Sequence, residues 1–185
     1  MPSHTDGIIE GQAGRDQEFY SALRGEDDLG MVVRAHIHTE HTVRAFITAA
    51  APVPEQVKFS AMDFDATVRL ALVLGLDAEF QKGLSSLGSL RNKFSHRLDM
   101  RIGEEEANNL YESLGPVTKR VVHHSKRVVH HSFARVRNGE PGKHADTFTK
   151  LVPRDRLLLC LIALRGGILI EVVRVLGKLD ELHGQ

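Results

Sequence analysis

The chain has 185 residues, which is enough for one domain of ordinary size. Its 24 Lys and Arg residues balance 24 Asp and Glu residues, and a formal net charge of zero excludes a protein coated in positive charge. The single cysteine excludes an internal disulfide and a cysteine-rich zinc module, and it fits a reducing cytosol. The longest apolar run, Leu157 to Leu164, is too short to cross a bilayer, so we expect a cytoplasmic protein with no membrane partner.

The N-terminal part of the chain predicts an arm followed by two helices. Residues 1–26 are rich in Gly, Asp and Gln, and we expect a flexible arm with one short helical stretch at residues 19–23, before a single domain over residues 27–185. Asp27 or Asp28 can cap a first helix that runs to about Ala50, where two prolines stop it. A second helix is expected over residues 66–74, before Gly75.

The clearest spacing in the chain lies between Asp77 and Leu98. Apolar residues recur there at steps of 4, 3, 3, 4 and 4, which places them on one side of a third helix. These residues are Phe80, Leu84, Leu87, Leu90, Phe94 and Leu98. Gly83 and Gly88 interrupt the stretch and indicate a break in this helix.

Three further helices are expected, over residues 104–114, 117–136 and 154–182, with an exposed loop at residues 137–150. The last helix is apolar on most sides, which favours a central position in a bundle, and its Cys160 is expected to pack in the core rather than act as a nucleophile. No strand-type alternation is sustained anywhere in the sequence. The predicted fold class is therefore all-α, a bundle of about five to six helices.

A seven-residue repeat, Lys-Arg-Val-Val-His-His-Ser, fills residues 119–125 and recurs unchanged at residues 126–132. Seven residues make about two helical turns, so the cations of both copies stack into one basic stripe. The stripe consists of Lys119, Arg120, Lys126 and Arg127. Clustered cations release counterions from nucleic acids, so the stripe is a candidate phosphate-binding surface. The alternative is a duplication that the helix tolerates without any binding role.

Polar residues are concentrated near the end of the third helix, in the sequence Leu-Arg-Asn-Lys-Phe-Ser-His-Arg at residues 90–97. Asn92, His96 and Asp99 follow one another at intervals of four and three residues, which predicts a polar ridge about opposite the leucines. Arg91 lies nearer the apolar side, and only its long aliphatic stem would let the guanidinium reach the ridge.

This cluster resembles the motif of the HEPN superfamily of helical domains. Asn92 follows Arg91 directly, and four residues separate Arg91 from His96. The preceding Leu87 and Leu90, together with a long helix that holds an early glutamate, are similar to the branch of mannitol-operon repressor-like proteins. The resemblance covers roughly residues 28–115, and it implies a helical bundle that dimerises and places two Arg/His motifs in one cleft.

The resemblance also implies a function, a metal-independent endoribonuclease of the toxin or defence type. His96 would then transfer protons, because histidine titrates near neutral pH, while Arg91 would hold the phosphate and Asn92 would orient the phosphate or the imidazole ring. Separately from the resemblance, the position of Asp99 three residues beyond His96 leads us to expect that it holds the imidazole ring. Several branches of the family are inactive, so the alternative is a non-catalytic transcriptional regulator or an interaction module. The expected partners are a second copy of the chain, RNA, and an antitoxin or a regulatory protein.

The first long helix predicts a buried polar pair. His36 and Glu40 are four residues apart and fall within its apolar face, and a buried carboxylate requires a partner, here His36, Arg44 or a residue from another helix. The pair is either structural or a support for the Arg91/His96 site. His36, His38 and His41 point in different directions on a helix, so we expect no metal site, and we expect no cofactor. The apolar face comprises Leu29, Val32, Val33, Ile37, Val43, Phe46 and Ile47.

Overall fold

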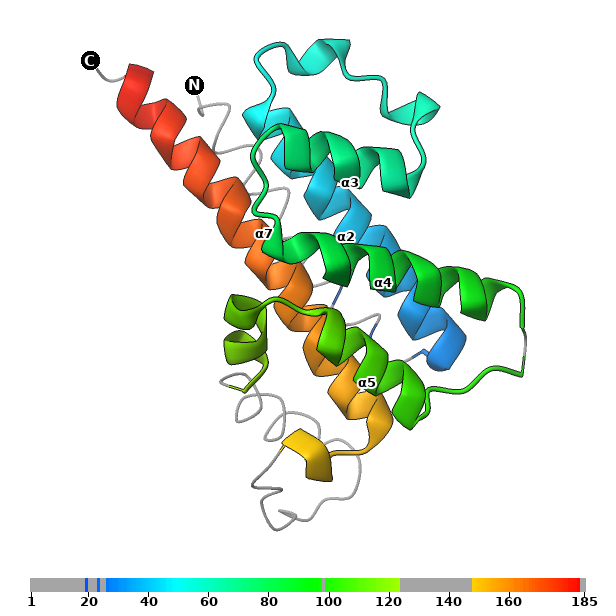
Figure 1. The fold of residues 1–185 in the computed structure, drawn as a ribbon. Coiled ribbons are helices and arrows are strands. Elements are labelled where there is room, and N and C mark those ends of the chain that lie inside the picture. Colours follow the sequence, from blue (N-terminus) through cyan, green and yellow to red (C-terminus); the bar gives the residue numbers. More distant parts are fainter. Residues whose placement is uncertain (1–18, 20–22, 24–25, 98, 124–147, 184–185) are drawn as a thin grey trace.

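The structure is a computed structural model that describes residues 19, 23, 26–97, 99–123 and 148–183. All regular structure in this part of the chain is helical, which confirms the all-α prediction (Figure 1). The main helices are α2 (Asp28–Ala50), α3 (Phe64–Val73), α4 (Glu79–Ser95), α5 (Glu104–Ser113) and α7 (Pro153–His183). Single 3₁₀ turns cover Pro54–Gln56, Phe59–Ala61 and Phe148–Lys150. Residues 116–123 are helical too, whereas the rest of the predicted fifth helix and most of the loop that follows it lie outside the described residues.

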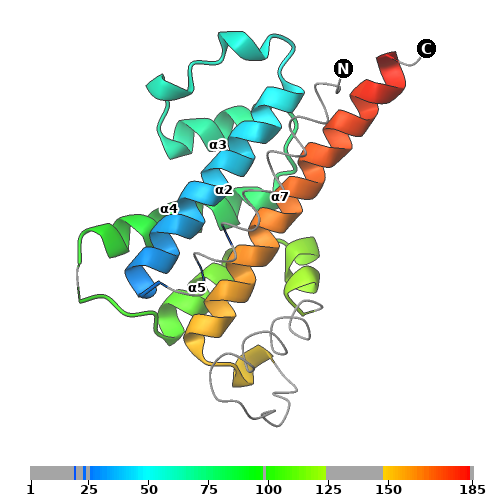
Figure 2. The ribbon, with the colours of Figure 1, turned by 180° about the vertical axis from the view of Figure 1, so that it is seen from behind.

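Helices α2 and α7 lie side by side and run in the same direction (Figures 1 and 2). Asp28 joins their starting ends, because its carboxylate accepts hydrogen bonds from Arg154 Nη1 at 2.5 Å and from the backbone N–H of Ile102 at 2.9 Å. Arg154 also donates to the backbone carbonyl of Glu26 at 2.7 Å. One carboxylate therefore fixes α2, α7 and the segment leading into α5 relative to one another.

The starts of α2 and α3 follow from side-chain caps. Asp27 accepts a hydrogen bond from the N–H of Gly30 at 2.7 Å, and α2 begins at the next residue, as predicted. Asp63 accepts from the N–H of Ala66 at 2.7 Å, so α3 begins at Phe64, two residues before the predicted start. The earlier start places Phe64 on the helix beside α4.

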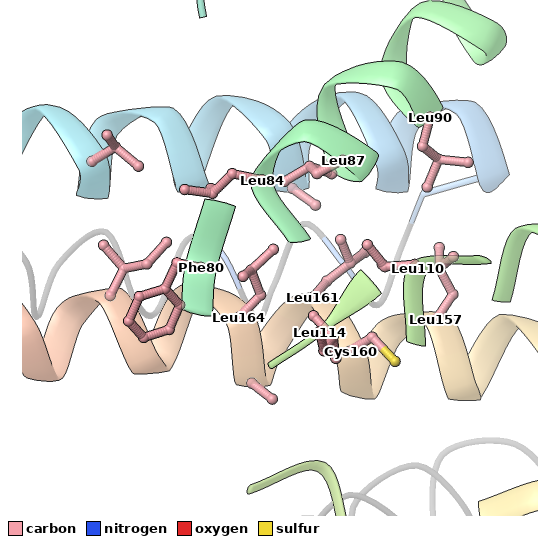
Figure 3. Close-up of a cluster of buried hydrophobic side chains, with 14 of the residues drawn as sticks. Phe80, Leu84, Leu87, Leu90, Leu110, Leu114, Leu157, Cys160, Leu161 and Leu164 are labelled. Carbon is pink, nitrogen blue, oxygen red and sulfur yellow. The ribbon is translucent and has the colours of Figure 1, made fainter. Parts of the chain in front are cut away.

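Five of the six residues predicted for the apolar side of α4 are buried, and the sixth, Leu98, lies outside the described residues (Figure 3). This side packs against leucines of α5 and α7, and the buried set in Figure 3 includes Phe80, Leu84, Leu87, Leu90, Leu110, Leu114, Leu157, Leu161 and Leu164. The predicted break is wrong, because α4 continues through both Gly83 and Gly88. Gly83 instead allows close packing, since a Cβ atom there would lie 3.0 Å from Leu164 and 3.2 Å from Leu114.

Polar contacts hold both ends of α4. At its start, the Glu79 carboxylate accepts hydrogen bonds from the N–H of Thr118 at 3.0 Å and from its hydroxyl at 2.8 Å, which caps the helix at residues 116–123. At its end, Lys93 Nζ donates to Glu106 at 2.6 Å, and this hydrogen bond raises the pKa of Lys93. Glu106 also accepts from the N–H of Gly103 and thereby caps α5.

The apolar face of α2 differs in part from the predicted one. Val32, Val43, Phe46 and Ile47 are buried, but Ile37 is 46% exposed. Thr39 is fully buried in a position that hydrophobicity alone would not assign to the core. The difference arises because the helices that cover α2 meet it from several directions, so the buried side is broader and displaced relative to an apolar stripe.

Helix α7 is central only along its first half. Leu157, Leu161 and Leu164 are fully buried there, whereas further along the helix Ile170 and Val173 are 63% and 51% exposed. Cys160 is fully buried, and its burial raises the pKa of the thiol to about 12, which confirms the expected packing role. No helix within the described residues combines the length and the apolar character that a membrane span requires.

Two residues of the predicted N-terminal arm belong to the core. Phe19 and Leu23 are buried, and the guanidinium of Arg165 lies 4.7 Å from the centre of the Phe19 ring. The composition of residues 1–26 predicted a flexible arm, but burying two large apolar side chains outweighs the local preference at these positions. The other residues of 1–25 lie outside the described part of the chain.

The neighbouring glycines of α7 predict two substitutions of opposite sign. An added Cβ at Gly167 would lie 2.7 Å from the Phe80 ring, so Gly167→Ala should lower the free energy of unfolding by about 1–3 kcal/mol. At Gly166 nothing lies within 4 Å, so Gly166→Ala should raise it by roughly 0.5–1 kcal/mol through helix propensity. Urea denaturation of dilute protein measures both effects. Equal effects at the two positions would contradict this packing.

Candidate functional site

A cleft with a volume of about 300 Å³ lies where α2, the start of α3 and α4 meet. We call it the Arg91 cleft. Its lining combines one buried histidine, two carboxylates, an arginine and several small polar residues. These residues are His36, Asp63, Phe64, Asp65, Ser85, Gly88, Ser89, Arg91 and Asn92.

The Phe64 ring lies between α2 and α4 and forms an apolar wall of the cleft. Its centre is 4.2 Å from the centre of the His36 ring. On the other side, a Cβ atom at Gly88 would lie 3.2 Å from Phe64, so glycine provides the space that the ring occupies. The cleft therefore depends on a small residue at position 88 of α4 and on the early start of α3.

His36 is neutral in this environment. Its side chain is 3% exposed, and burial lowers the pKa of His36 below its ordinary value of 6.5. The positive charge of Arg91 lowers this pKa further, whereas the carboxylate of Glu40 opposes the shift. His36 and Arg91 both line the cleft, and this proximity explains the effect of the guanidinium on the imidazole.

Glu40 has two of the predicted partners, although its side chain is only partly buried, at 21% exposure. Its carboxylate accepts a hydrogen bond from Arg44 at 2.5 Å, and its second oxygen lies 3.9 Å from Nδ1 of His36. The guanidinium of Arg44 in turn lies 5.4 Å from the centre of the Phe59 ring. Glu40 is outside the lining of the Arg91 cleft and reaches it only through His36.

Arg91 and Asn92 contact each other on the surface of the cleft. Both are exposed, and Arg91 Nη1 donates a hydrogen bond to Asn92 Oδ1 at 2.8 Å. Within the described residues Arg91 forms no ion pair, so its forked donors remain available to a phosphate or carboxylate group. The two carboxylates of the cleft are engaged elsewhere, because Asp63 caps α3 and Asp65 pairs with Arg69 at 2.8 Å.

His96 and Asp99 do not join this cleft in a single copy of the chain. Helix α4 ends at Ser95, and His96 is the exposed residue that terminates it, four residues beyond Asn92. Asp99 is exposed and lies past the helix, so the predicted helical ridge stops before it. The described residues show no hydrogen bond between His96 and Asp99. The helix stops here because the chain must turn toward Ile102, whose N–H binds Asp28.

The predicted basic stripe is described only at its first two residues. Lys119 binds Glu112 at 2.9 Å and lies 4.9 Å from the centre of the Tyr111 ring, so a phosphate would have to compete with Glu112 for it. Arg120 is exposed. Lys126 and Arg127 lie outside the described residues.

The histidines near the start of the chain diverge, as expected on a helix. His36 packs on Phe64, whereas the His38 ring packs edge-on against Phe19, with ring centres 5.4 Å apart. Across the described ranges, no group of three or more His, Cys, Asp or Glu side chains is arranged to hold a metal ion.

Sequence reasoning missed most of the cleft lining. The available signal was a second face on α4, where Ser85, Gly88, Ser89 and Asn92 recur at intervals of three, one and three residues. It also missed the contact between the first repeat and α5, in which the Tyr111 hydroxyl and His123 Nε2 are 2.9 Å apart. Local spacing alone could not show which residues pack against this face of α4, or that Tyr111 lies beside His123.

Comparisons with protein-family models, with curated proteins and with solved structures found no match to this chain. The resemblance to HEPN domains therefore depends on the Arg91, Asn92 and His96 spacing and its leucine context. A function has to be inferred from the geometry of these residues in the fold.

The neutral state of His36 predicts that the protein loses stability in mild acid. Below about pH 6.5 the unfolded chain binds a proton that folded His36 excludes, so the free energy of unfolding should fall as the pH falls toward the lowered pKa. His36→Gln should flatten this part of the profile, and the exposed His41→Gln should leave it unchanged. Urea denaturation at several pH values measures the slope. An unaltered slope in His36→Gln would exclude this explanation.

The two charges near His36 predict opposite changes in its titration. Arg91→Gln removes a positive charge and should raise the pKa of His36, whereas Glu40→Gln removes a negative charge and should lower it. An NMR titration of the His36 ring proton in each variant measures the shifts. Shifts of the same sign would show that the imidazole responds to altered burial and not to these charges.

Proposed function

We propose that the protein is a HEPN-like helical dimer that cleaves RNA without a metal ion, with Arg91, Asn92 and His96 as the reacting residues. The observation that supports this proposal is the exposure of all three residues at the end of α4, while the opposite side of the same helix is buried in the core. A rigid helix thus presents a cation and an imidazole to solvent, where a phosphate and a second copy of the chain can reach them.

The residue types fit the chemistry of RNA cleavage. The 2′-hydroxyl loses its proton to a base, the 2′-oxygen bonds to phosphorus, and the bond to the 5′-oxygen breaks as that oxygen takes up a proton. The products are a 2′,3′-cyclic phosphate and a free 5′-hydroxyl. Histidine performs both proton transfers near neutral pH, and the forked donors of Arg91 stabilise the charge on the phosphorane. Asn92 holds the guanidinium through the 2.8 Å hydrogen bond.

A second copy of the chain is part of the proposed site. One copy provides a single exposed histidine at the end of α4, outside the cleft that contains Arg91. Cleavage requires a base and an acid on opposite sides of the phosphate, and two facing motifs supply both. His36 cannot replace the second histidine, because it is buried and neutral.

A non-catalytic role is the second candidate, and the position of His96 favours it. His96 lies beyond the end of α4 and outside the lining of the Arg91 cleft. A dimer that leaves the two groups apart would bind RNA or a protein through Arg91 without cutting, as a transcriptional regulator or an interaction module would. The two candidate functions differ in whether the protein cleaves the RNA that it binds.

The proposal predicts RNA cleavage that persists in EDTA. Arg91→Ala and His96→Ala should each reduce the rate about 100-fold or more, the usual loss when an acid–base group or a charge-stabilising group is removed. The matched control is His41→Ala, because His41 is also exposed but lies on α2. Gel analysis of a labelled RNA measures the rate, and the product ends should carry the cyclic phosphate.

Binding measured on the same proteins separates the two candidates. RNA binding without cleavage, weakened by Arg91→Ala and unaffected by His96→Ala, would replace the nuclease with the non-catalytic role. Equal cleavage by wild type and both variants would trace the activity to a contaminant and end the catalytic proposal.

A further inference from the structure

The outer face of the second half of α7 carries an apolar stripe that the fold leaves exposed. The stripe consists of Gly166, Ile170, Val173 and Gly177. Ile170 is 63% exposed and Val173 is 51% exposed, although buried residues of the same helix, such as Ile168 and Val172, face the core. Helix α7 runs along the near side of the molecule in Figure 2. By helical spacing the stripe lies on the side of α7 opposite the buried Ile168 and Val172, and none of its residues lines the Arg91 cleft.

The spacing within the stripe is the same when it is read in either direction. Its members are separated by four, three and four residues, with a glycine at each end and a β-branched apolar residue at each inner position. These intervals keep all four residues on one side of an α-helix. A two-fold axis midway along the stripe would place Gly166 opposite Gly177 of a second copy, and Ile170 opposite Val173 of that copy. Such self-complementarity is what a symmetric dimer interface requires.

We propose that this stripe is a self-association surface, on which α7 of a second copy of the chain packs in the antiparallel direction. Ile170 and Val173 form the centre of the contact and bury their exposed surface there. The inference goes beyond the proposed RNA cleavage, because it concerns a different face of the molecule and needs none of the cleft residues.

The glycines and the flanking charges fit this occupant. A Cβ atom added at Gly166 or Gly177 would meet nothing within 4 Å in the described chain, so space is open for a facing helix, and glycine lets two backbones approach closely. Beside the stripe, Glu171 and Arg174 form an ion pair. Their charges cancel, and like-charge repulsion between two identical faces is therefore small.

The size of the stripe sets the expected strength of association. It is about 16 Å long at the rise of an α-helix and is only one helix face wide. Its area is therefore smaller than the roughly 800 Å² per partner that a stable dimer buries. We therefore expect association in the micromolar range, which depends on protein concentration.

The first test measures mass against concentration by analytical ultracentrifugation. Ile170→Glu introduces two charges into each symmetric contact and should weaken association through α7 about 100-fold or more. The matched control is Val73→Glu, because Val73 is also an exposed apolar residue, at 82%, but lies at the end of α3. Wild-type protein that stays monomeric at all concentrations, or an equal effect of both substitutions, would overturn the proposal.

The second test examines orientation by oxidative cross-linking. A mixture of Gly166→Cys and Gly177→Cys proteins should form a disulfide-linked heterodimer, whereas each variant alone should not, because identical positions lie about 16 Å apart in the antiparallel pair. Wild-type protein, with its buried Cys160, is the background control. Cross-linking of Gly166→Cys to itself would indicate parallel packing and would overturn the proposal. The absence of a cross-link in every sample would show that α7 of a second copy does not bind this face, and would also overturn it.

RNA cleavage distinguishes a failure of this proposal from a failure of the proposed function. Ile170→Glu should abolish association through α7 and leave cleavage unchanged, because Ile170 is not part of the Arg91 cleft lining. His96→Ala should abolish cleavage and leave the Gly166–Gly177 cross-link intact. Loss of cleavage in Ile170→Glu would contradict the independence of the two surfaces.

Discussion

The close packing of α4 on α7 determines where the polar groups of this protein lie. Gly83 of α4 faces Leu164 of α7, and Gly167 of α7 faces the Phe80 ring of α4. Each helix therefore has a glycine at the point where a large side chain of the other helix packs against it. This packing fixes the relative position of the two helices closely, because protein interiors are close-packed and the addition of a single methylene group disturbs them. With its apolar side fixed in this way, α4 places Arg91 and Asn92 on its exposed side, where they line the cleft beside α2 and α3.

The Arg91 cleft follows from this constraint. Phe64 and His36 fill the space between α3, α2 and α4, with ring centres 4.2 Å apart, and Gly88 leaves room for the Phe64 ring. The buried imidazole is held neutral, while the guanidinium beside it stays exposed and charged. A guanidinium without an ion pair among the described residues, beside an apolar wall, can bind an anionic group, and this chemistry is common to both functions considered for the protein.

The two faces of helix α7 have different environments. One face is buried against the other helices, and the opposite face of its second half exposes Ile170 and Val173. None of the residues in this apolar stripe lines the polar cleft.

The sequence by itself determined the helical fold and most helix boundaries, because they depend on local features. The leucine spacing defined the buried side of α4, and Asp27 defined the start of α2. Local spacing also identified His36 and Glu40 as neighbours, of which His36 is buried and Glu40 is only partly buried. It failed where the outcome depends on distant residues: Gly83 and Gly88 indicated a break, yet their neighbours Leu164 and Phe64 make them packing positions within a continuous helix.

Only the tertiary structure decided which polar residues share a cleft. The spacing placed His96 and Asp99 with Asn92, but α4 ends at Ser95, so the cleft instead joins Arg91 and Asn92 to His36 from a helix far away in the sequence. Tertiary packing also left Ile170 and Val173 exposed on one face of the second half of α7, while Val172 and Leu176 on its other face are buried. The physical reason is that helical periodicity defines a face, whereas burial depends on which other helix covers that face.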